Sequence, residues 1–499
     1  MLANRAPVVA GWEGTLTGGV LAQCNAHAPE VILEIPATLA PENTPNAGFD
    51  ALRRKLSGPL REPGNPGYAE LATPWNLAVA TSPAAVLEAA NAQDVSEGLK
   101  FAAANGLPVA VQATGHGIAS DLAGTLLIHT RSLNRCEVSP NGNGGSAYTG
   151  AGTTWTSVLE ACAGPGLAGL CGSAPGVSVA GYTSGGGVGP MARTFGAASD
   201  RVTAIDVVTG DGVLRHATAE SEPELFWGLR GGKGSLGIIT GMEFGLLPLP
   251  MVYGGALFFG TDSVERVLRT WAQWCPTLPR AATTSVALMQ LPPMPGVPAP
   301  LAGKFTIAVR YVYAGDPDDG GSWLAPMRAA GELLMDAVGP MPSSMIGMVH
   351  SDPEDSLPAA EASALLADFP EAAAQALLDC AGPGTLSPQL MVEIRQFGGA
   401  LSDEPEVPSA LCHRQAGYGL YTVGVAAPPE LAPIRSHAAG LLQSMSGWAY
   451  GGTLPNFSAG TGSAGFDASY TPQALERLTA LAGRFDPDRL FRVGQVPTR

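Results

Sequence analysis

The spacing of hydrophobic residues predicts alternating helices and strands along the first half of the chain. Apolar residues recur every three or four positions over 94–105, where Asp94 is a favourable N-cap and Asn105-Gly106 a stop signal. Helices are also predicted at 155–163 and, beginning with acidic residues, at 222–228. Short apolar or alternating runs predict strands at 107–112, 125–129, 148–150, 202–209, 213–217 and 236–244, with a hairpin turn at Asp211-Gly212.

The pattern changes at Leu247-Pro248-Leu249-Pro250, where we place a domain boundary. Beyond it, strands are predicted at 307–313, 391–395 and 421–425, and helices at 323–335, 359–366, 371–378 and 472–485. The proline-rich segment 291–300 is predicted to be a loop that covers a surface. The expected organisation is an N-terminal extension (1–50), a first domain (51–249), a second domain (250–455) and a C-terminal segment (456–499).

The composition excludes several classes of protein. Hydrophobic residues make up 45% of the 499 residues and charged residues 14%, which is enough apolar material for large cores. The net charge of −16 argues against nucleic acid and anionic membranes as partners. We find no apolar stretch of membrane-spanning length and no signal-peptide core, so a cytoplasmic location is expected. The seven cysteines are scattered without a C-x-x-C pair, so we expect no structural metal site and no disulfide framework.

Three glycine-rich segments carry the most specific chemistry. The first is a strand that ends in Gly115-His116-Gly117, and the others are 185–189 and 230–237. Consecutive backbone N–H groups in such turns can hold phosphate, and glycine permits the backbone angles that the turns need. The chain is therefore predicted to bind a large phosphate-bearing cofactor, with His116 as its reactive contact. Taken alone, His116 could instead be a buried histidine that bonds a turn carbonyl.

In their order along the chain, these segments resemble the berberine bridge enzyme-like flavoproteins of the vanillyl-alcohol-oxidase superfamily. The resemblance rests on 106–116, 179–187, 226–240 and 485–491, and it extends from about residue 68 to the end. It implies an α+β fold with a PCMH-type FAD-binding domain of two α/β subdomains (51–249), to which the berberine-bridge-like segment 456–499 returns. It also implies a substrate domain (250–455) whose antiparallel sheet is backed by helices.

The resemblance further implies bound FAD, with His116 joined covalently to the 8α-methyl group of the flavin. The implied cofactor contacts are His116, Gln112, Ala113, Thr114, Gly115, Gly117, Pro175, Val177, Gly181, Gly185, Gly186, Gly187, Gly237, Ile239 and Asn456. The first loop departs from the family pattern Arg-Gly-Gly-Gly-His-Ser, because this chain has Gln112-Ala113-Thr114-Gly115-His116 and so lacks a cation near the pyrophosphate. Backbone donors remain, so FAD is still expected.

Two positions on the second loop bear on flavin chemistry. Some members of the family form a second link from a cysteine, but the matching position here is Ala174, and Cys171 lies three residues earlier. We therefore expect Cys171 to be an unlinked thiol. Val177 matches the position that governs oxygen access in the family, where a small β-branched residue goes with oxidases.

The catalytic residues are harder to predict. Glu393 and Arg395 share one face of a predicted strand. They could contact the substrate or supply the base, or they could equally be a Glu–Arg pair on the surface. Tyr182, Tyr421 and Tyr450 are candidate acid or base groups, although a single tyrosine is more often a packed aromatic. Leu454 stands where carbohydrate-oxidising members often have tyrosine, which disfavours a sugar.

The expected function is a FAD-dependent oxidase. It would remove hydride from a carbinol or amine carbon of a small, fairly apolar substrate of the secondary-metabolite type, and O₂ would reoxidise the flavin to give H₂O₂. A dehydrogenase, an oxidative cyclase or a carbohydrate oxidase of the same fold, and a non-enzymatic flavin carrier, remain alternatives. The sequence names neither the substrate nor the oligomeric state.

Overall fold

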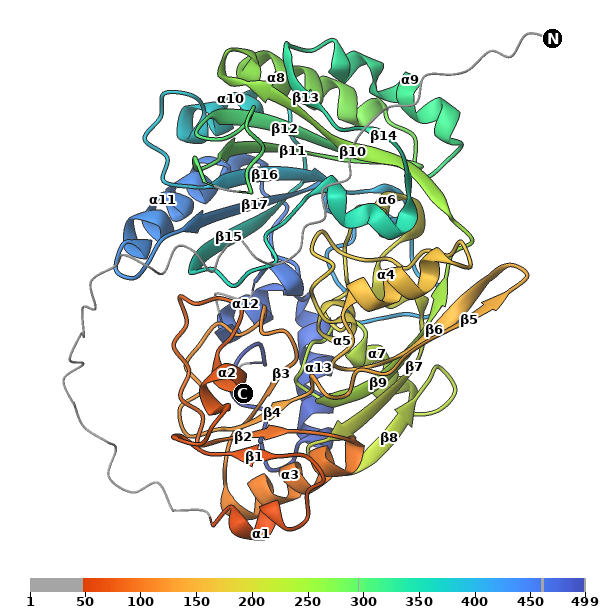
Figure 1. Ribbon diagram of the computed structural model, residues 1–499, viewed down its shortest axis with the longest axis vertical. Helices are drawn as coiled ribbons and strands as arrows, with labels where there is room; N and C mark the ends of the chain where they lie inside the picture. The colour runs from red at the N-terminus through yellow and green to blue at the C-terminus, as the bar shows by residue number, and fades with distance from the viewer. Residues whose placement is uncertain (1–47, 295, 459–461, 498–499) are drawn as a thin grey trace. The chain divides into compact units, whose positions relative to one another are not determined.

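A computed structural model describes residues 48–294, 296–458 and 462–497 (Figure 1). Residues 47–499 form one compact unit. The expected N-terminal extension lies almost entirely outside the described residues. Among those that are described, no helix is both long and apolar enough to cross a membrane.

The first sheet is small and mostly parallel. Its order is β1 (Leu60–Arg61), β2 (Ala85–Glu88), β4 (Leu126–His129) and β3 (Val109–Gln112), with β2, β4 and β3 parallel and β1 antiparallel to β2. Helix α3 (Ala92–Asn105) joins β2 to β3 and confirms the predicted helix, but its N-cap is Asn91. Asp94 instead lies buried and accepts the backbone N–H groups of Ser57, Gly58 and Ala90, so its carboxylate ties the preceding loop to the helix.

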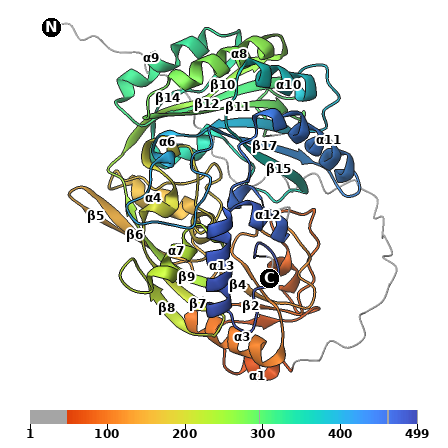
Figure 2. The same cartoon turned by 180° about the vertical axis from the view of Figure 1, so that it is seen from behind.

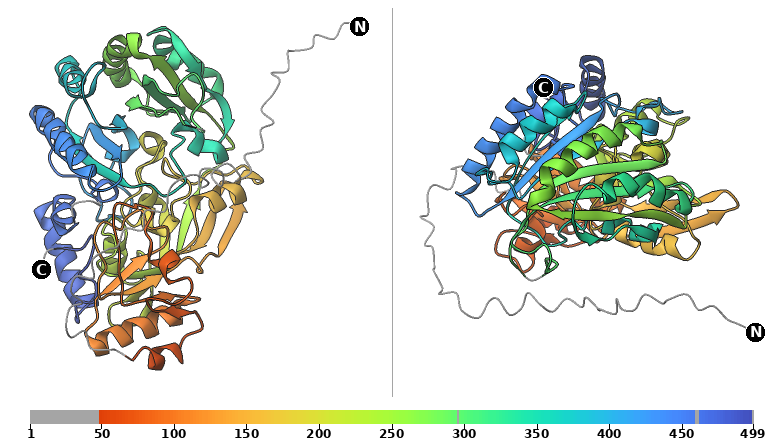
Figure 3. Two further views of the ribbon diagram at one scale, coloured as in Figure 1. Left: turned by 60° about the vertical axis from the view of Figure 1, so that its left-hand side comes forward. Right: turned by 90° about the horizontal axis from the view of Figure 1, so that it is seen from above.

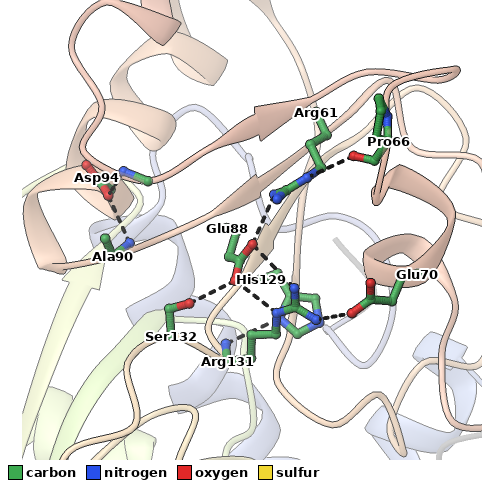
Figure 4. A network of polar contacts seen from close by, with 10 residues as sticks. Arg61, Pro66, Glu70, Glu88, Ala90, Asp94, His129, Arg131 and Ser132 are labelled. Carbon is green, nitrogen blue, oxygen red and sulfur yellow. Dashed lines mark hydrogen bonds and ion pairs between the residues drawn. The ribbon is translucent and has the colours of Figure 1, made fainter.

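A polar network fixes the edge of this sheet (Figure 4). Glu88, at the end of β2, accepts hydrogen bonds from Arg61, Arg131 and Ser132 at 2.9, 2.9 and 2.8 Å. These contacts, the Arg131 bond foremost, lower the pKa of Glu88 to about 2, so it remains a carboxylate. Arg131 also pairs with Glu70 on α2 (Tyr68–Ala72), so one carboxylate connects β1, β2 and the segment after β4.

The second sheet is antiparallel. Its order is β5 (Cys136–Asn141), β6 (Gly144–Gly150), β9 (Gly237–Leu246), β7 (Val202–Thr209) and β8 (Leu214–Ala217). The Asp211-Gly212 hairpin is confirmed between β7 and β8, because Asp211 accepts the Val213 N–H and Gly212 adopts φ +71°. Helices α4 (Trp155–Ala163) and α7 (Pro223–Leu229) pack on this part of the chain, and Trp155 and Phe226 are buried in its core.

The third sheet has eight antiparallel strands. Its order is β13 (Leu333–Asp336), β10 (Met251–Gly260), β12 (Phe305–Tyr313), β11 (Ala282–Gln290), β16 (Met391–Gln396), β17 (Tyr418–Val425) and β15 (Ala359–Leu366), and β14 (Gly339–Pro342) also pairs with β10. Helices α8 (Val264–Trp274), α9 (Pro317–Arg328), α10 (Glu371–Ala381) and α11 (Leu431–Ser444) cover one face (Figures 1 and 2), and the view from above shows them lying along it (Figure 3). The predicted antiparallel sheet backed by helices is confirmed.

One predicted helix of this region is wrong, and another has the wrong bounds. Residues 359–366 form strand β15, because their pairing with β17 outweighs the helix propensity of alanine and leucine. The helix predicted at 323–335 is α9, which begins at Pro317 after the Asp316 cap and ends at Arg328. The last residues of the predicted helix, from Leu333 onward, instead form strand β13, which pairs with β10.

The C-terminal segment packs back onto the first two sheets. Helix α13 (Pro472–Phe485) has the predicted bounds, with the Thr471 hydroxyl accepting the Ala474 N–H. Beyond it, the Val109 N–H at the edge of β3 donates to the Leu490 carbonyl at 2.9 Å. The remaining helices are α1 (Asp50–Arg53), α5 (Val179–Thr183), α6 (Ala192–Phe195) and α12 (Gly462–Ala468).

Candidate cofactor and substrate site

The first glycine loop presents His116 as a neutral imidazole. Gly115 has φ +80°, and a Cβ there would lie 2.7 Å from the Trp75 nitrogen, so the turn requires glycine. The His116 ring stacks on Trp75, with 4.6 Å between ring centroids and 20° between planes. Burial lowers the pKa of His116 to about 4, so the ring is unprotonated at neutral pH and has a lone pair to act as a nucleophile.

The first and second loops touch each other. The Ser178 N–H donates to the Thr114 hydroxyl at 3.3 Å, and the Ser178 hydroxyl in turn accepts the Gly181 N–H at 3.2 Å to cap α5. Half-buried Val177 is held by its carbonyl, which accepts the Trp155 N–H at 3.1 Å. The expected contacts Thr114, Val177 and Gly181 are therefore neighbours in space.

The glycines of the second loop pack closely against the rest of the protein. The N–H groups of Gly185 and Gly186 donate to the carbonyls of Tyr182 and Thr183, so they are not free for phosphate. Gly186 and Gly187 have φ +98° and +76°, and added Cβ atoms would lie 2.6 Å from a Leu411 methyl and 2.7 Å from the Ala198 methyl. These glycines permit close protein packing.

The third loop packs against the second. The N–H groups of Gly231 and Lys233 both donate to the Ser184 carbonyl, at 2.9 and 3.1 Å. Gly237 and Ile239 pair with Thr209 and Val207 in the sheet. The N–H groups of Gly185, Gly186, Gly231 and Lys233 are thus bonded within the protein, and contact between the glycines of these loops and a cofactor stays a prediction.

A cradle of chain atoms surrounds Gly185. A Cβ at Gly185 would lie 2.1 Å from Asn456 Oδ1 and 2.6 Å from Lys233 Cε. Asn456 donates its amide to the Tyr182 carbonyl at 2.9 Å and accepts from Lys233 Nζ at 2.6 Å. Asn456 and the second loop, predicted separately from the sequence, therefore meet here.

These residues fit a dinucleotide such as FAD. Gln112 Oε1 and Thr183 Oγ1 are buried without a hydrogen-bond partner among the described residues. Buried polar atoms of this kind ordinarily have partners, so they are suited to the polar groups of a bound molecule. A neutral histidine, unpaired polar atoms and the half-buried Lys233 cation together match the electrophilic flavin, the ribityl hydroxyls and the phosphates.

Cys171 lies in the core and not at a reactive surface. It is 1% exposed, and its thiol donates to the Gly172 carbonyl at 3.2 Å. Burial raises the pKa of the Cys171 thiol far above its usual value, so the thiolate that would attack a flavin does not form.

We therefore expect Cys171→Ser to retain its flavin with an unchanged visible spectrum. Serine preserves the small polar side chain, and no bond to the cofactor is lost. Mass spectrometry of the flavin-bearing peptide from the wild-type protein checks this, since a peptide in which Cys171 is joined to flavin would contradict it.

Two cavities share Arg395 and Phe397 in their walls, and the end of the second loop lines the first of them. The first lies between the chain after the second loop and the third sheet, with Val188, Val312 and Gln396 in its wall. The second lies between β15, β17 and residues 453–457, with Tyr421 and Leu454 in its wall. A small molecule in either cavity would contact Arg395.

Glu393 belongs to a buried ionic cluster. It accepts hydrogen bonds from Arg310 at 2.6 Å, Arg395 at 2.7 Å and Ser285 at 2.6 Å, and His350 Nε2 lies 3.4 Å away. Burial alone would raise its pKa, but Arg395, Arg310 and His350 outweigh it and hold the pKa of Glu393 well below its usual value. Such a carboxylate is a poor base and is better placed to position Arg395. The interpretation as a surface pair is wrong, because Glu393 is fully buried and Arg395 mostly so.

Tyr421 and Glu361 form the pair best suited to proton transfer. The Tyr421 hydroxyl donates to Glu361 Oε1 at 2.6 Å. Burial raises the pKa of Glu361 above its usual value, and this effect outweighs the hydrogen bond from Tyr421, which lowers it. The pKa of Tyr421 is raised well above the usual value of a tyrosine, mainly by burial and also by the nearby Glu361 carboxylate. Glu361 is exposed, so the proton that it receives can pass to solvent. The sequence missed Glu361 because the segment was read as a helix.

The other two candidate tyrosines are not part of either cavity wall. Tyr182 is edge-on to Trp155 with ring centroids 5.9 Å apart, and its hydroxyl is buried without a partner among the described residues. Tyr450 is 39% exposed and packs edge-on to His413. Neither lines these two cavities, and an acid or base role for either tyrosine stays a prediction.

Residues 83–218 match the family described as a FAD binding domain. The FAD-dependent monooxygenase prx3 of Penicillium roqueforti is 28% identical over 227 residues, 45% of this chain and 44% of that protein. The (R)-6-hydroxynicotine oxidase of Paenarthrobacter nicotinovorans is 26% identical over 237 residues, 47% of this chain and 48% of that enzyme. The chain thus spans about half the length of these curated relatives.

Solved structures match over most of the chain. The 6-hydroxy-D-nicotine oxidase from Arthrobacter nicotinovorans has a TM-score of 0.75 at 22% identity, over 88% of this chain and 97% of that one. The BBE-like 1 protein of Physcomitrella patens has a TM-score of 0.75 at 16% identity, over 89% and 98%. At such identities the likeness shows the fold, and it confirms the predicted α+β fold with a PCMH-type FAD-binding domain and a large antiparallel sheet.

Proposed function

Since this chain carries a FAD binding domain and has the fold of the berberine bridge enzyme-like FAD-linked oxidoreductases, we propose that it is an oxidase of a small carbinol or amine. The observation that carries the proposal is the Tyr421–Glu361 hydrogen bond of 2.6 Å, with Tyr421 in the wall of a cavity that Arg395 and Phe457 also line. In this assignment residues 51–249 and 456–499 hold the cofactor, and 250–455 bind the substrate.

Bound FAD would supply the hydride acceptor. The chain supplies the proton acceptor: Tyr421 Oη takes the proton of the substrate hydroxyl or amine while its own proton moves to the Glu361 carboxylate. Tyrosine then stays neutral throughout, as its raised pKa requires, and the raised pKa of Glu361 makes that carboxylate a stronger proton acceptor than an ordinary glutamate.

The cavity walls suggest the class of substrate. Phe397, Leu454 and Phe457 are apolar, and the Arg395 guanidinium lies 5.3 Å from the centre of the Phe457 ring. Such a wall suits a small, fairly apolar molecule with a few polar groups. Leu454 provides no hydroxyl to a sugar.

The free thiols of the described cysteines suit a reducing compartment, and we propose the cytoplasm as the location.

His116 is the proposed attachment point of the flavin. A neutral imidazole, held flat by Trp75, has the ionisation state needed to attack an electrophilic carbon. The proposal adds O₂ as the second substrate, with H₂O₂ as its product.

We expect Val177→Leu to slow reoxidation of the reduced protein by O₂ and to change its reduction by substrate much less. Val177 is half-buried in a bonded segment, and one extra methylene there would fill space that O₂ needs. A tenfold slowing corresponds to about 1.4 kcal/mol in the barrier. Stopped-flow measurement of both half-reactions tests this, with Val177→Ala as the control that keeps the space open. Equal losses in both half-reactions, or an unchanged reoxidation rate, would remove Val177 from this role.

The function itself is tested by a substrate screen. Small alcohols, amines and oligosaccharides are supplied in air, and H₂O₂ is measured. Active compounds are then retested without O₂ and with an artificial electron acceptor. Turnover that requires O₂ supports the oxidase, whereas turnover only with the artificial acceptor identifies a dehydrogenase.

A further inference from the structure

Lys233 occupies a backbone conformation that lysine rarely adopts. Its φ is +58°, in a Gly-Gly-Lys-Gly sequence where glycine would be unstrained. A non-glycine residue in the left-handed region costs about 1 kcal/mol or more. Such an outlier, in a loop otherwise made of glycine, points to a function for the side chain.

The Lys233 side chain is also a half-buried cation without an anion among the described residues. Its ammonium donates to Asn456 Oδ1 at 2.6 Å and lies 3.5 Å from the Gly181 carbonyl, and both partners are neutral. No carboxylate pairs with it among the residues that the structure describes. Burial lowers the pKa of Lys233 to about 8, so the group is charged at neutral pH at a cost in solvation.

The groups around the Lys233 ammonium indicate which anion would pair with it. Lys233 Cε would lie 2.6 Å from a Cβ at Gly185, and Asn456 and Gly181 complete the same cradle. The first loop has Gln112, Ala113 and Thr114 and no cation of its own. FAD carries a pyrophosphate, and its isoalloxazine ring gains negative charge on reduction.

We propose that Lys233 neutralises a negative charge of the bound cofactor, either its pyrophosphate or its reduced ring. The proposal rests on the proposed function, because it requires that FAD be bound. In this proposal, Lys233 replaces the cation that the first loop of this chain lacks.

The two sources of the charge are separated by two measurements on Lys233→Gln. If the partner is the pyrophosphate, the dissociation constant for FAD rises about tenfold to a hundredfold, as expected for a lost bond to a charged group. It is measured in a His116→Ala background, where FAD binds without a covalent link. If the partner is the reduced ring, the two-electron reduction potential of the holoenzyme falls instead, by about 30 mV for each tenfold loss.

Three further variants separate the effect of the charge from the effect of the backbone conformation. Lys233→Arg retains the charge and should recover part of either effect. Lys233→Gly relieves the left-handed backbone, so the melting temperature of its FAD-free form should equal or exceed that of wild type while the charge effect persists. Lys304→Gln removes an exposed lysine and should change neither quantity.

The proposal fails if folded Lys233→Gln and Lys233→Gly proteins match wild type in both FAD affinity and potential. A colourless wild-type protein that binds no FAD would overturn the proposed function, and this inference with it. A yellow wild type with unaffected variants would overturn only the role of Lys233.

Discussion

The wild-type protein is expected to keep its flavin after denaturation in acid, and His116→Ala is expected to release all of it. A covalent bond survives unfolding, whereas the contacts of the loops do not. The intact mass of the wild-type protein should exceed that of the chain by one FAD. This expectation rests on the family resemblance of the first loop, which implies the link at His116, and the stacked, neutral imidazole is compatible with it.

His129 provides a matched control for this experiment. It is also a buried histidine whose pKa burial lowers to about 4, and it lies on β4 directly opposite Gln112 of β3. His129→Gln should therefore keep the flavin attached. Flavin in the supernatant of the denatured wild-type protein would refute the covalent link while leaving open that FAD binds.

Tyr421→Phe is expected to slow reduction by substrate about 10²- to 10⁴-fold, the usual contribution of a general base. Phenylalanine keeps the ring between Arg395 and Phe457 but cannot pass a proton to Glu361. Reoxidation by O₂ should be unchanged, because it does not use this pair. Anaerobic stopped-flow reduction measures the effect, and Tyr450→Phe, an exposed tyrosine, is the control.

The pair also predicts a pH dependence. Glu361 accepts a proton only when it is ionised, so kcat/KM should fall as the pH drops through the pKa of Glu361. Because burial raises that pKa, this acid limb should lie above the range of an ordinary glutamate. Glu361→Gln should remove the limb along with most of the activity. A Tyr421→Phe enzyme within a few-fold of wild type would exclude the pair as the proton acceptor.

Local signals explain which elements could be predicted from sequence. Helix α4 and helix α13 have the predicted bounds because Gly164-Pro165-Gly166 ends the first and Thr471 caps the second. Strand β7 was predictable from alternation, and its hairpin from Asp211-Gly212. Strand β15 was not, because its alanine-rich sequence favours a helix and only its pairing with β17 makes it a strand.

The same distinction applies to the site. The first loop and Asn456 could be located by motif, since glycine and histidine at fixed positions are local features. Glu361 reaches Tyr421 because Ser363 lies opposite Tyr421 in the β15–β17 register, which places Glu361 diagonally across. The burial of Glu393 between two arginines, and the isolation of the Lys233 ammonium, depend on segments that are distant in sequence.

The central claim is that the chain is a FAD-linked oxidase, and its visible spectrum during one reduction and reoxidation cycle tests this most directly. The purified protein should be yellow, should bleach when a substrate from the screen is added without O₂, and should regain its colour in air with release of one H₂O₂ per flavin. A colourless protein, or a flavin that a substrate reduces but air does not reoxidise, would contradict the account.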